Sequence, residues 1–176
     1  MQKLIIIRGH SGSGKSTFAH QKIIEFKNTF SNAIIYHIEN DKYMIKDGVY
    51  SWTKNAYLQA KQFAKKDIQQ AFQQMRLNPI ANILLVISNV GANRREIDEY
   101  LSLAETYKID VEIYRMQNFF RNQHNVSLSI VCNMYLDILA TPLPDETLVP
   151  VVKPMSPYIK QKLQRISYFR NIKESK

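Results

Sequence analysis

Residues 4–17 read LIIIRGHSGSGKST, and this stretch decides the expected fold. The apolar run at residues 4–7 is typical of a buried β-strand. It leads into a complete match to the phosphate-binding loop pattern G-x-x-x-x-G-K-[ST] within residues 9–17. A segment without Gly or Pro opens at Lys15 and can form a helix. Strand, glycine-rich loop and helix therefore follow in the order that a phosphate-binding loop requires.

The residue types in this loop indicate a nucleoside triphosphate as ligand. Glycines let successive N–H groups point at phosphate oxygens, and the helix N-terminus adds partial positive charge. Lys15 would reach the β- and γ-phosphates, and the Ser16 hydroxyl would be a ligand for Mg²⁺. The predicted cofactors are ATP or GTP with Mg²⁺. The predicted binding residues are Gly9, His10, Ser11, Gly12, Ser13, Gly14, Lys15, Ser16 and Thr17.

The length and composition are those of one ordinary intracellular domain. A chain of 176 residues can bury a sizeable core without disulfides or a structural metal. Its single cysteine, Cys132, cannot form an intrachain disulfide. No stretch approaches the ~20 apolar residues that a membrane span needs. We therefore expect a soluble, cytoplasmic protein with no membrane partner.

The charge favours polyanionic partners. The formal net charge is +9, from 24 Lys and Arg against 15 Asp and Glu. Much of the excess lies in residues 153–176, where Tyr158, Tyr168 and Phe169 are interleaved with the basic residues. This pattern is typical of a surface that contacts nucleic-acid phosphates and stacks on bases. A basic amphipathic helix docked on the domain would have the same pattern, so both interpretations stay open.

The rest of the chain repeats the strand–helix order. This order predicts the α/β class, as a three-layer P-loop NTPase fold with a parallel sheet of four to five strands flanked by helices. We expect a P-loop domain at residues 1–152 and a basic helical tail at 153–176. The expected strands are 4–7, 33–38, 82–88, 111–116 and an edge strand at 148–152, and the expected helices are 15–28, 53–75, 93–107, 128–139 and one after Pro157.

Acidic residues end the second expected strand, at Glu39-Asn40-Asp41. In parallel α/β sheets, ligands bind outside the carboxyl ends of the strands. Asp41 is therefore a candidate catalytic carboxylate and metal neighbour.

Several short segments carry a resemblance to a known family. They are IENDKY at residues 38–43, DGVYSW at 47–52, SN at 88–89 with Arg94-Arg95 after it, and RNQHNV at 121–126. Over roughly residues 1–138, the chain resembles the kinase domain of phage polynucleotide 5′-hydroxyl kinases and the related small P-loop kinases that include the zeta toxins. The resemblance implies ATP-dependent transfer of the γ-phosphate to a hydroxyl, with a polynucleotide or nucleotide 5′-OH as acceptor. It also implies that Asp41 is the general base and that Arg121 lies on a lid segment over the donor phosphates, beside the catalytic Lys15.

The chain also departs from that family. Val86-Ile87 stands where the family commonly has an acidic or amide residue before the Ser-Asn pair. Metal support is therefore assigned to Ser16 and Asp41 with water. Lys42 and Met44 replace an acid and an arginine near the base. Two alternatives remain open: a kinase for a small metabolite such as a nucleoside or nucleotide sugar, and a nucleotide-binding module that transfers nothing.

Other residues near these motifs have two interpretations each. Tyr50 and Trp52 would stack on an acceptor base or cover the core. His124 would contact phosphate or be incidental. Arg115 and the Arg94-Arg95 pair compete with Arg121 as cations for the phosphates.

Overall fold

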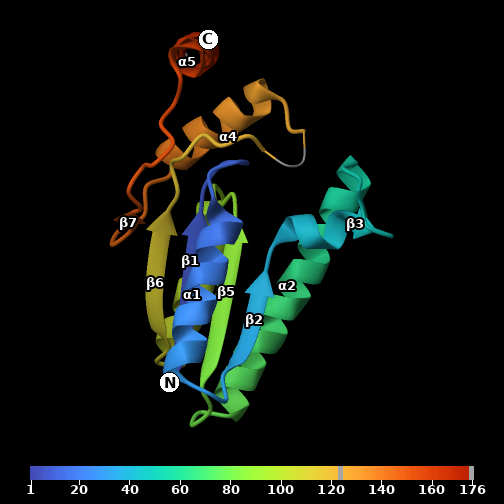
Figure 1. The fold of residues 1–176 in the computed structure, drawn as a ribbon, viewed down its shortest axis with the longest axis vertical. Helices are drawn as coiled ribbons and strands as arrows, with labels where there is room; N and C mark the ends of the chain where they lie inside the picture. Colours follow the sequence, from blue (N-terminus) through green and yellow to red (C-terminus); the bar gives the residue numbers. More distant parts are fainter. Residues whose placement is uncertain (123–124, 175–176) are drawn as a thin grey trace.

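The computed structural model describes residues 1–122 and 125–174. It contains a five-stranded, fully parallel sheet with strand order β2-β5-β1-β6-β7 (Figure 1). The strands are β1 (Gln2–Arg8), β2 (Ile34–Ile38), β5 (Ile83–Asn89), β6 (Asp110–Arg115) and β7 (Thr147–Leu148). The predicted fold class, a three-layer P-loop NTPase fold, is confirmed.

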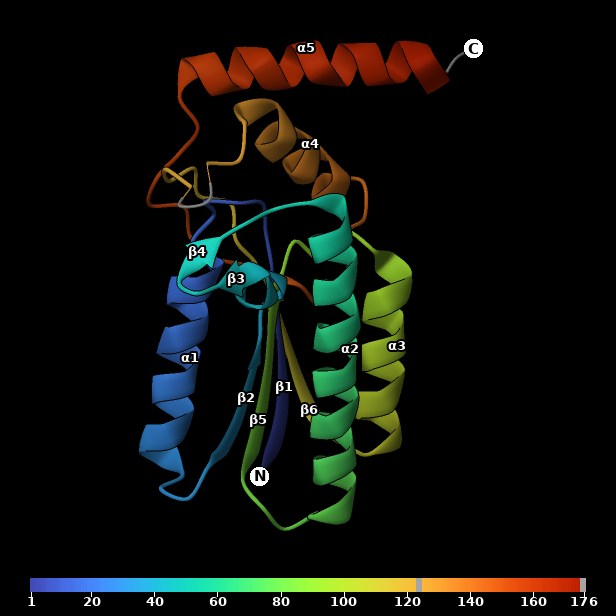
Figure 2. The ribbon, with the colours of Figure 1, turned by 90° about the vertical axis from the view of Figure 1, so that its right-hand side faces the viewer.

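Helices cover both faces of the sheet. Helix α1 (Lys15–Thr29) lies on one face, and α2 (Lys54–Leu77) and α3 (Arg94–Thr106) lie on the other (Figure 2). The central strand β1 is apolar on both faces because each face meets a helix layer. Ile5 and Ile7 pack with α1, whereas Leu4 and Ile6 pack in the cluster that contains α2 and α3 residues.

Two further helices lie beyond the carboxyl ends of the strands. They are α4 (Leu128–Leu139) and α5 (Pro157–Glu174), which cross above the sheet in Figures 1 and 2. Leu163 of α5 joins Val131 and Cys132 of α4 in a separate apolar cluster. Arg170 donates to Asp137 at 2.7 Å. Helix α5 is thus docked on α4, above the edge of the sheet where ligands bind in this fold class.

A small hairpin follows β2, where the sequence predicts no strand. A 3₁₀ segment, η1 (Asn40–Met44), leads into β3 (Ile45–Lys46) and β4 (Val49–Tyr50), which pair antiparallel. Asp47 and Gly48 join them with φ of 50° and 76°. Positive φ at both central residues is the geometry for which the Asp-Gly pair is favoured in tight hairpins.

The expected edge strand at 148–152 is shorter and starts earlier, as β7. Pro150 and Pro154 lack the N–H groups that would continue a ladder. The backbone N–H groups of Val152 and Lys153 donate instead to the Asn118 side-chain oxygen, at 2.7 and 2.8 Å. None of the described helices combines the length and apolar composition needed to cross a membrane.

Candidate nucleotide-binding and phosphotransfer site

The P-loop (residues 9–17) connects β1 to α1 at the carboxyl edge of the sheet. Gly12 and Gly14 have φ of 79° and 97°, which side chains other than glycine rarely adopt. A Cβ on Gly9 would lie 2.9 Å from the Met116 carbonyl oxygen, and one on Gly12 would lie 2.6 Å from the Phe120 carbonyl oxygen. The loop is therefore built around these glycines, as a cradle of backbone amides requires.

Lys15 lies across the loop at the start of α1. Its ammonium donates to the His10 carbonyl at 3.0 Å. Burial lowers the pKa of Lys15 to about 8, although the carboxylates of Asp41 and Glu39 favour its protonated form. A bound polyanion would restore the full positive charge, because negative charges nearby stabilise an ammonium. Lys15 is thus placed to respond to phosphate.

The other predicted loop residues divide into exposed and buried ones. Ser16 and Thr17 are exposed on the first turn of α1, whereas Ser13 is buried. His10 is also buried: its Nδ1 donates to the Ser11 carbonyl at 2.9 Å, and its ring lies 4.2 Å from the Phe119 ring. Burial lowers its pKa to about 4, so this imidazole is neutral at pH 7. His10 can therefore contribute to phosphate binding only through its backbone.

Asp41 lies in η1, directly after β2, and its carboxylate is exposed. It is close enough to Lys15 to stabilise the ammonium. The Tyr50 hydroxyl, on β4, donates a hydrogen bond to Asp41, and burial together with that carboxylate raises the pKa of Tyr50 to about 12. The small hairpin thus orients Asp41, and the structure brings Lys15 and Asp41 to one site.

Glu39 is a second carboxylate at this edge, and the sequence motifs assign it no role. The Ser88 hydroxyl donates to Glu39 at 2.8 Å, and the Ser16 side chain of the P-loop lies close enough to influence the pKa of this carboxylate. Although burial opposes ionisation, hydrogen bonds from His37 and Ser16 lower the pKa of Glu39 well below its usual range. Its proximity to Ser88 follows from the β2–β5 pairing, which the sequence order of the strands does not reveal.

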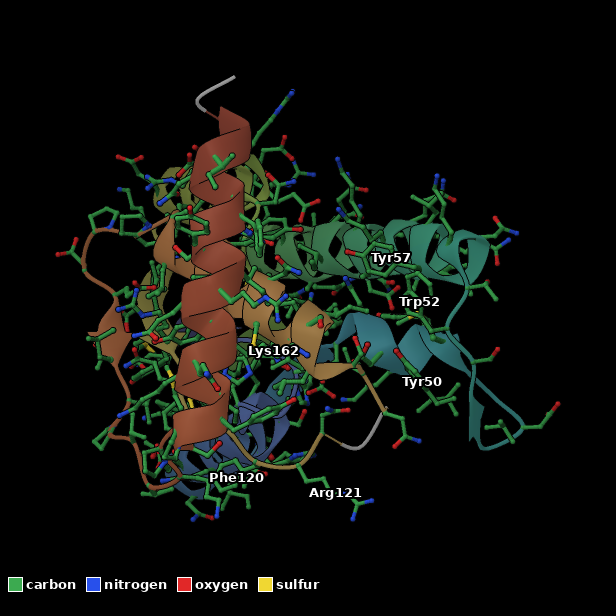
Figure 3. The ribbon with its side chains drawn as sticks, turned by 90° about the horizontal axis from the view of Figure 1, so that it is seen from above. Tyr50, Trp52, Tyr57, Phe120, Arg121 and Lys162 are labelled. Carbon is green, nitrogen blue, oxygen red and sulfur yellow. The ribbon has the colours of Figure 1, made fainter. Side chains whose placement is uncertain are left out.

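The segment after β6 contacts the P-loop from the opposite side. The Phe120 N–H donates to the Gly12 carbonyl at 2.9 Å, and the Phe120 side chain is 44% exposed. Arg121 follows, exposed, and Figure 3 shows its side chain directed away from the ribbons. Arg121 would therefore have to turn inward to touch a bound phosphate. His124 lies outside the described residues.

Comparison with known sequences places the chain in a family. No protein-family model matches the chain. The uncharacterized protein PM0531 of Pasteurella multocida (strain Pm70) is 42% identical over 166 residues, which are 94% of this chain and 93% of PM0531. The chain belongs to the PM0531 family.

Two solved structures share the fold of this PM0531-family chain. Kti12 of Chaetomium thermophilum, in complex with ADP-AlF3, is 12% identical and gives a TM-score of 0.54, with 93% of this chain and 96% of that chain covered. A chain of the PezAT chromosomal toxin–antitoxin system of Streptococcus pneumoniae is 15% identical and gives a TM-score of 0.53, with 100% and 88% covered. At these identities the likeness concerns the fold alone.

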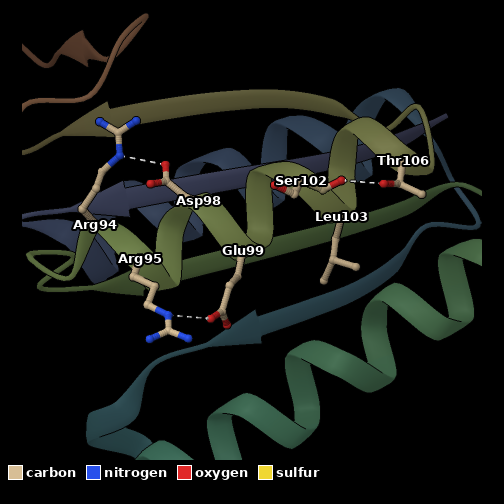
Figure 4. Close-up of a pocket in the computed structure, with 7 residues that line it drawn as sticks. All are labelled: Arg94, Arg95, Asp98, Glu99, Ser102, Leu103 and Thr106. Atoms are coloured by element: carbon tan, nitrogen blue, oxygen red, sulfur yellow. Dashed lines mark hydrogen bonds and ion pairs between the residues drawn. The ribbon is translucent and has the colours of Figure 1, made fainter.

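The competing arginines of this PM0531-family protein are engaged elsewhere. Arg8 and Arg115 share the buried Glu146 carboxylate, at 3.1 and 3.0 Å. Arg94 and Arg95 border a shallow depression along α3 (Figure 4). They pair there with acids of the same helix, at 2.7 and 3.5 Å. The three competing arginines, Arg115, Arg94 and Arg95, therefore have structural partners, unlike Lys15, whose ammonium contacts a carbonyl at the loop.

Aromatic side chains gather beside the hairpin that carries Tyr50, the hydrogen-bond partner of Asp41. Figure 3 shows Tyr50, Trp52 and Tyr57 grouped between the hairpin and the N-terminal end of α2. Trp52 is 61% exposed, so it does not cover the core. An exposed indole in the same group as Tyr50 offers a flat apolar surface for an acceptor.

The donor set fits the predicted ligand of the PM0531-family site. The amide cradle and Lys15 suit adjacent phosphates. The Ser16 hydroxyl and the carboxylates of Glu39 and Asp41 supply oxygen atoms, which are the ligands that Mg²⁺ prefers. A magnesium–nucleoside triphosphate complex is therefore compatible with the residues present.

Proposed function

We propose that the protein is an ATP-dependent phosphotransferase that transfers the γ-phosphate to a hydroxyl, and that the acceptor is the 5′-OH of a polynucleotide or nucleotide. The observation that carries the proposal is the convergence of Lys15 and Asp41 at the P-loop, with a carboxylate held by Tyr50. Phosphoryl transfer needs a cationic clamp on the phosphates and a group that orients the attacking hydroxyl.

Each residue has a role in the proposed reaction. The P-loop amides and Lys15 hold the β- and γ-phosphates, and bound Mg²⁺ would neutralise charge that develops on them. The acceptor oxygen attacks the γ-phosphorus while the bond to the β–γ bridging oxygen breaks, and ADP leaves. Asp41 takes the proton of the acceptor hydroxyl, and the Tyr50 hydroxyl keeps the Asp41 carboxylate in place.

Helix α5 supports a polyanionic acceptor. Lys160 and Arg165 are exposed on it, as are Tyr158, Tyr168 and Phe169. The Arg165 guanidinium lies 6.0 Å from the centroid of the Phe169 ring. Such pairing of cations with exposed aromatic rings suits a chain of phosphates and stacked bases. Arg170 is not part of this exposed basic surface, because its side chain binds Asp137 and Asn133 of α4.

Two alternatives have weaker support. A small-metabolite kinase needs no basic surface, although the aromatic group of Tyr50, Trp52 and Tyr57 would also accept a nucleoside. A module without transfer activity is suggested by Ile87, where a carboxylate is absent from the end of β5. Kti12, which shares the fold, is in complex with ADP-AlF3. This supports nucleotide binding under either alternative, the small-metabolite kinase or the module without transfer activity.

Asp41→Asn separates binding from transfer. The substitution keeps the side-chain volume and removes the charge, so ATP affinity should change little while acceptor phosphorylation falls by ~10²-fold or more. Asp98→Asn, at an exposed carboxylate on α3, is the matched control and should keep the wild-type rate. Isothermal titration with a non-hydrolysable nucleotide and a γ-labelled ATP assay measure the two quantities. An unchanged rate in Asp41→Asn would exclude Asp41 as the base.

A further inference from the structure

A hydrogen-bonded network surrounds Glu39 where β2 and β5 end side by side. Because Ile38 pairs with Ile87 in the parallel sheet, the next residues, Glu39 and Ser88, are also neighbours. The Ser88 hydroxyl donates to Glu39 Oε1 at 2.8 Å, and the Lys42 ammonium lies 3.2 Å from Glu39 Oε2. The carboxylate is therefore bound at both oxygens.

The network has a defined direction. Lysine has only donors, so Lys42 Nζ donates to His37 Nδ1, at 3.1 Å. Because Nδ1 accepts from Lys42, the hydrogen-bonding geometry assigns a proton to His37 Nε2, which donates to Ser88 Oγ at 2.9 Å. Ser88 in turn donates to Glu39. Lys42, His37 and Ser88 form one chain of donors that ends on the carboxylate, and this chain holds it ionised in a single orientation.

This carboxylate faces the P-loop. The hydroxyl of Ser16, the residue expected to ligate Mg²⁺, lies close enough to Glu39 to lower the pKa of this carboxylate. A mostly buried anion is costly unless its surroundings compensate it, and here every described contact of the carboxylate is a donor. Asp41, by contrast, accepts from Tyr50 and is exposed. The two carboxylates thus have different partners and different surroundings.

We propose that Glu39, rather than Asp41, is the carboxylate that supports a divalent cation on the Ser16 hydroxyl, with Lys42, His37 and Ser88 as its positioning residues. Glu39, directly after β2, thereby supplies the negative charge that Ile87, near the end of β5, lacks. The inference rests on the proposed function, because the cation arrives with the nucleoside triphosphate. In this arrangement the role of Asp41 is to receive the proton of the acceptor.

The test measures how nucleotide affinity depends on Mg²⁺, so it does not require turnover. A non-hydrolysable ATP analogue is titrated calorimetrically into each variant, first in EDTA and then over a series of Mg²⁺ concentrations. Loss of a group that orients a metal ligand typically costs 10–100-fold in metal affinity. We expect Glu39→Gln to keep the affinity measured in EDTA and to need about 10–100-fold more Mg²⁺ for half-maximal tightening.

Two controls give the shift its meaning. Asp41→Asn should show the wild-type Mg²⁺ dependence. Glu112→Gln removes another half-buried carboxylate, which pairs with Lys3 within the sheet, and should also behave as wild type. The inference is overturned if Glu39→Gln keeps the wild-type Mg²⁺ midpoint, or if Asp41→Asn is the variant that shifts it.

A second variant tests the same inference if Glu39→Gln does not fold. Ser88→Ala keeps the Glu39 charge and removes its donor, so it should shift the Mg²⁺ midpoint in the same direction by a smaller factor. Thermal unfolding shows whether each variant is folded; if Glu39→Gln is not, an unshifted midpoint in Ser88→Ala overturns the inference. Failure of the wild-type protein to bind the analogue overturns the proposed function and the inference together. Mg²⁺-dependent binding that Glu39→Gln weakens, in a protein that transfers no phosphate, overturns the phosphotransfer alone.

Discussion

Lys15 should make nucleotide affinity fall between pH 7 and pH 9. Burial lowers its pKa to about 8 in the free protein, from an ordinary value of 10.5. Bound phosphates place negative charge beside the ammonium and raise the pKa again. Above pH 8 the complex therefore binds more protons than the free protein does, and by linkage the affinity decreases as the pH rises.

The magnitude follows from the two protonation states. With a pKa of about 8, about nine-tenths of the free protein carries the Lys15 proton at pH 7 and about one-tenth at pH 9. If the complex stays protonated, the association constant falls about tenfold over this range, or ~1.4 kcal/mol. At pH 8.5, binding should take up about 0.8 proton. The terminal phosphate adds little to this change, because its second pKa is near 6.

Isothermal titration in two buffers with different ionisation enthalpies measures both the affinity and the proton uptake. Lys15→Met should bind nucleotide more weakly at pH 7 and show no slope between pH 7 and pH 9. Lys22→Met is the control: it removes a lysine of α1 that pairs with Glu25, and the slope should persist. A flat wild-type profile, or a slope that survives in Lys15→Met, would refute the assignment of Lys15 to the phosphates.

The remaining predictions concern the loop, its buried histidine and α5. Gly12→Ala should weaken nucleotide binding by ~10-fold or more, since both φ and the facing carbonyl oppose a Cβ; Gly48→Ala, with similar φ but open space around it, should not. His10 has a folded pKa of about 4, below its unfolded value of 6.5, so its stabilisation is complete above pH 6.5 and declines as the pH falls. The free energy of unfolding, measured in urea, should therefore decrease by about 3 kcal/mol between pH 7 and pH 4 because of this group, and His10→Leu should lack this decrease. An equal decrease in both proteins would exclude His10 as its cause. Reversing Lys160 and Arg165 to Glu should reduce the slope of log oligonucleotide affinity against log salt by roughly 0.7 for each phosphate group that the variant no longer binds, and an unchanged slope would remove α5 from the interface.

The sequence predicted the central elements because their signals are local. The run at residues 4–7 and the glycines after it define β1 and the P-loop without reference to other segments. The repeated strand–helix order was sufficient for the parallel sheet, since such connections favour parallel strands. The hairpin around Asp47-Gly48 was not predicted, because the two-residue strands on either side are too short for a periodic signal.

The site was only partly predictable, because its other features depend on packing. Glu39 lies beside Ser88 only because β2 pairs with β5, and strand order cannot be read from chain order. The His10 side chain turns under the loop toward Phe119, although the motif treats it as one more loop position. Arg170 looks like other basic residues of α5 in the sequence, yet it binds α4.

Label transfer from γ-labelled ATP to a 5′-hydroxyl oligonucleotide tests the central claim most directly. The acceptor panel also contains the same oligonucleotide with a 5′-phosphate, a nucleoside and a nucleotide sugar. We predict Mg²⁺-dependent labelling of the 5′-hydroxyl oligonucleotide, none of the 5′-phosphorylated one, and loss of labelling in Lys15→Ala and Asp41→Asn. Labelling of the nucleoside or nucleotide sugar alone would contradict the polynucleotide acceptor, and nucleotide binding without transfer to any hydroxyl would contradict the phosphotransferase.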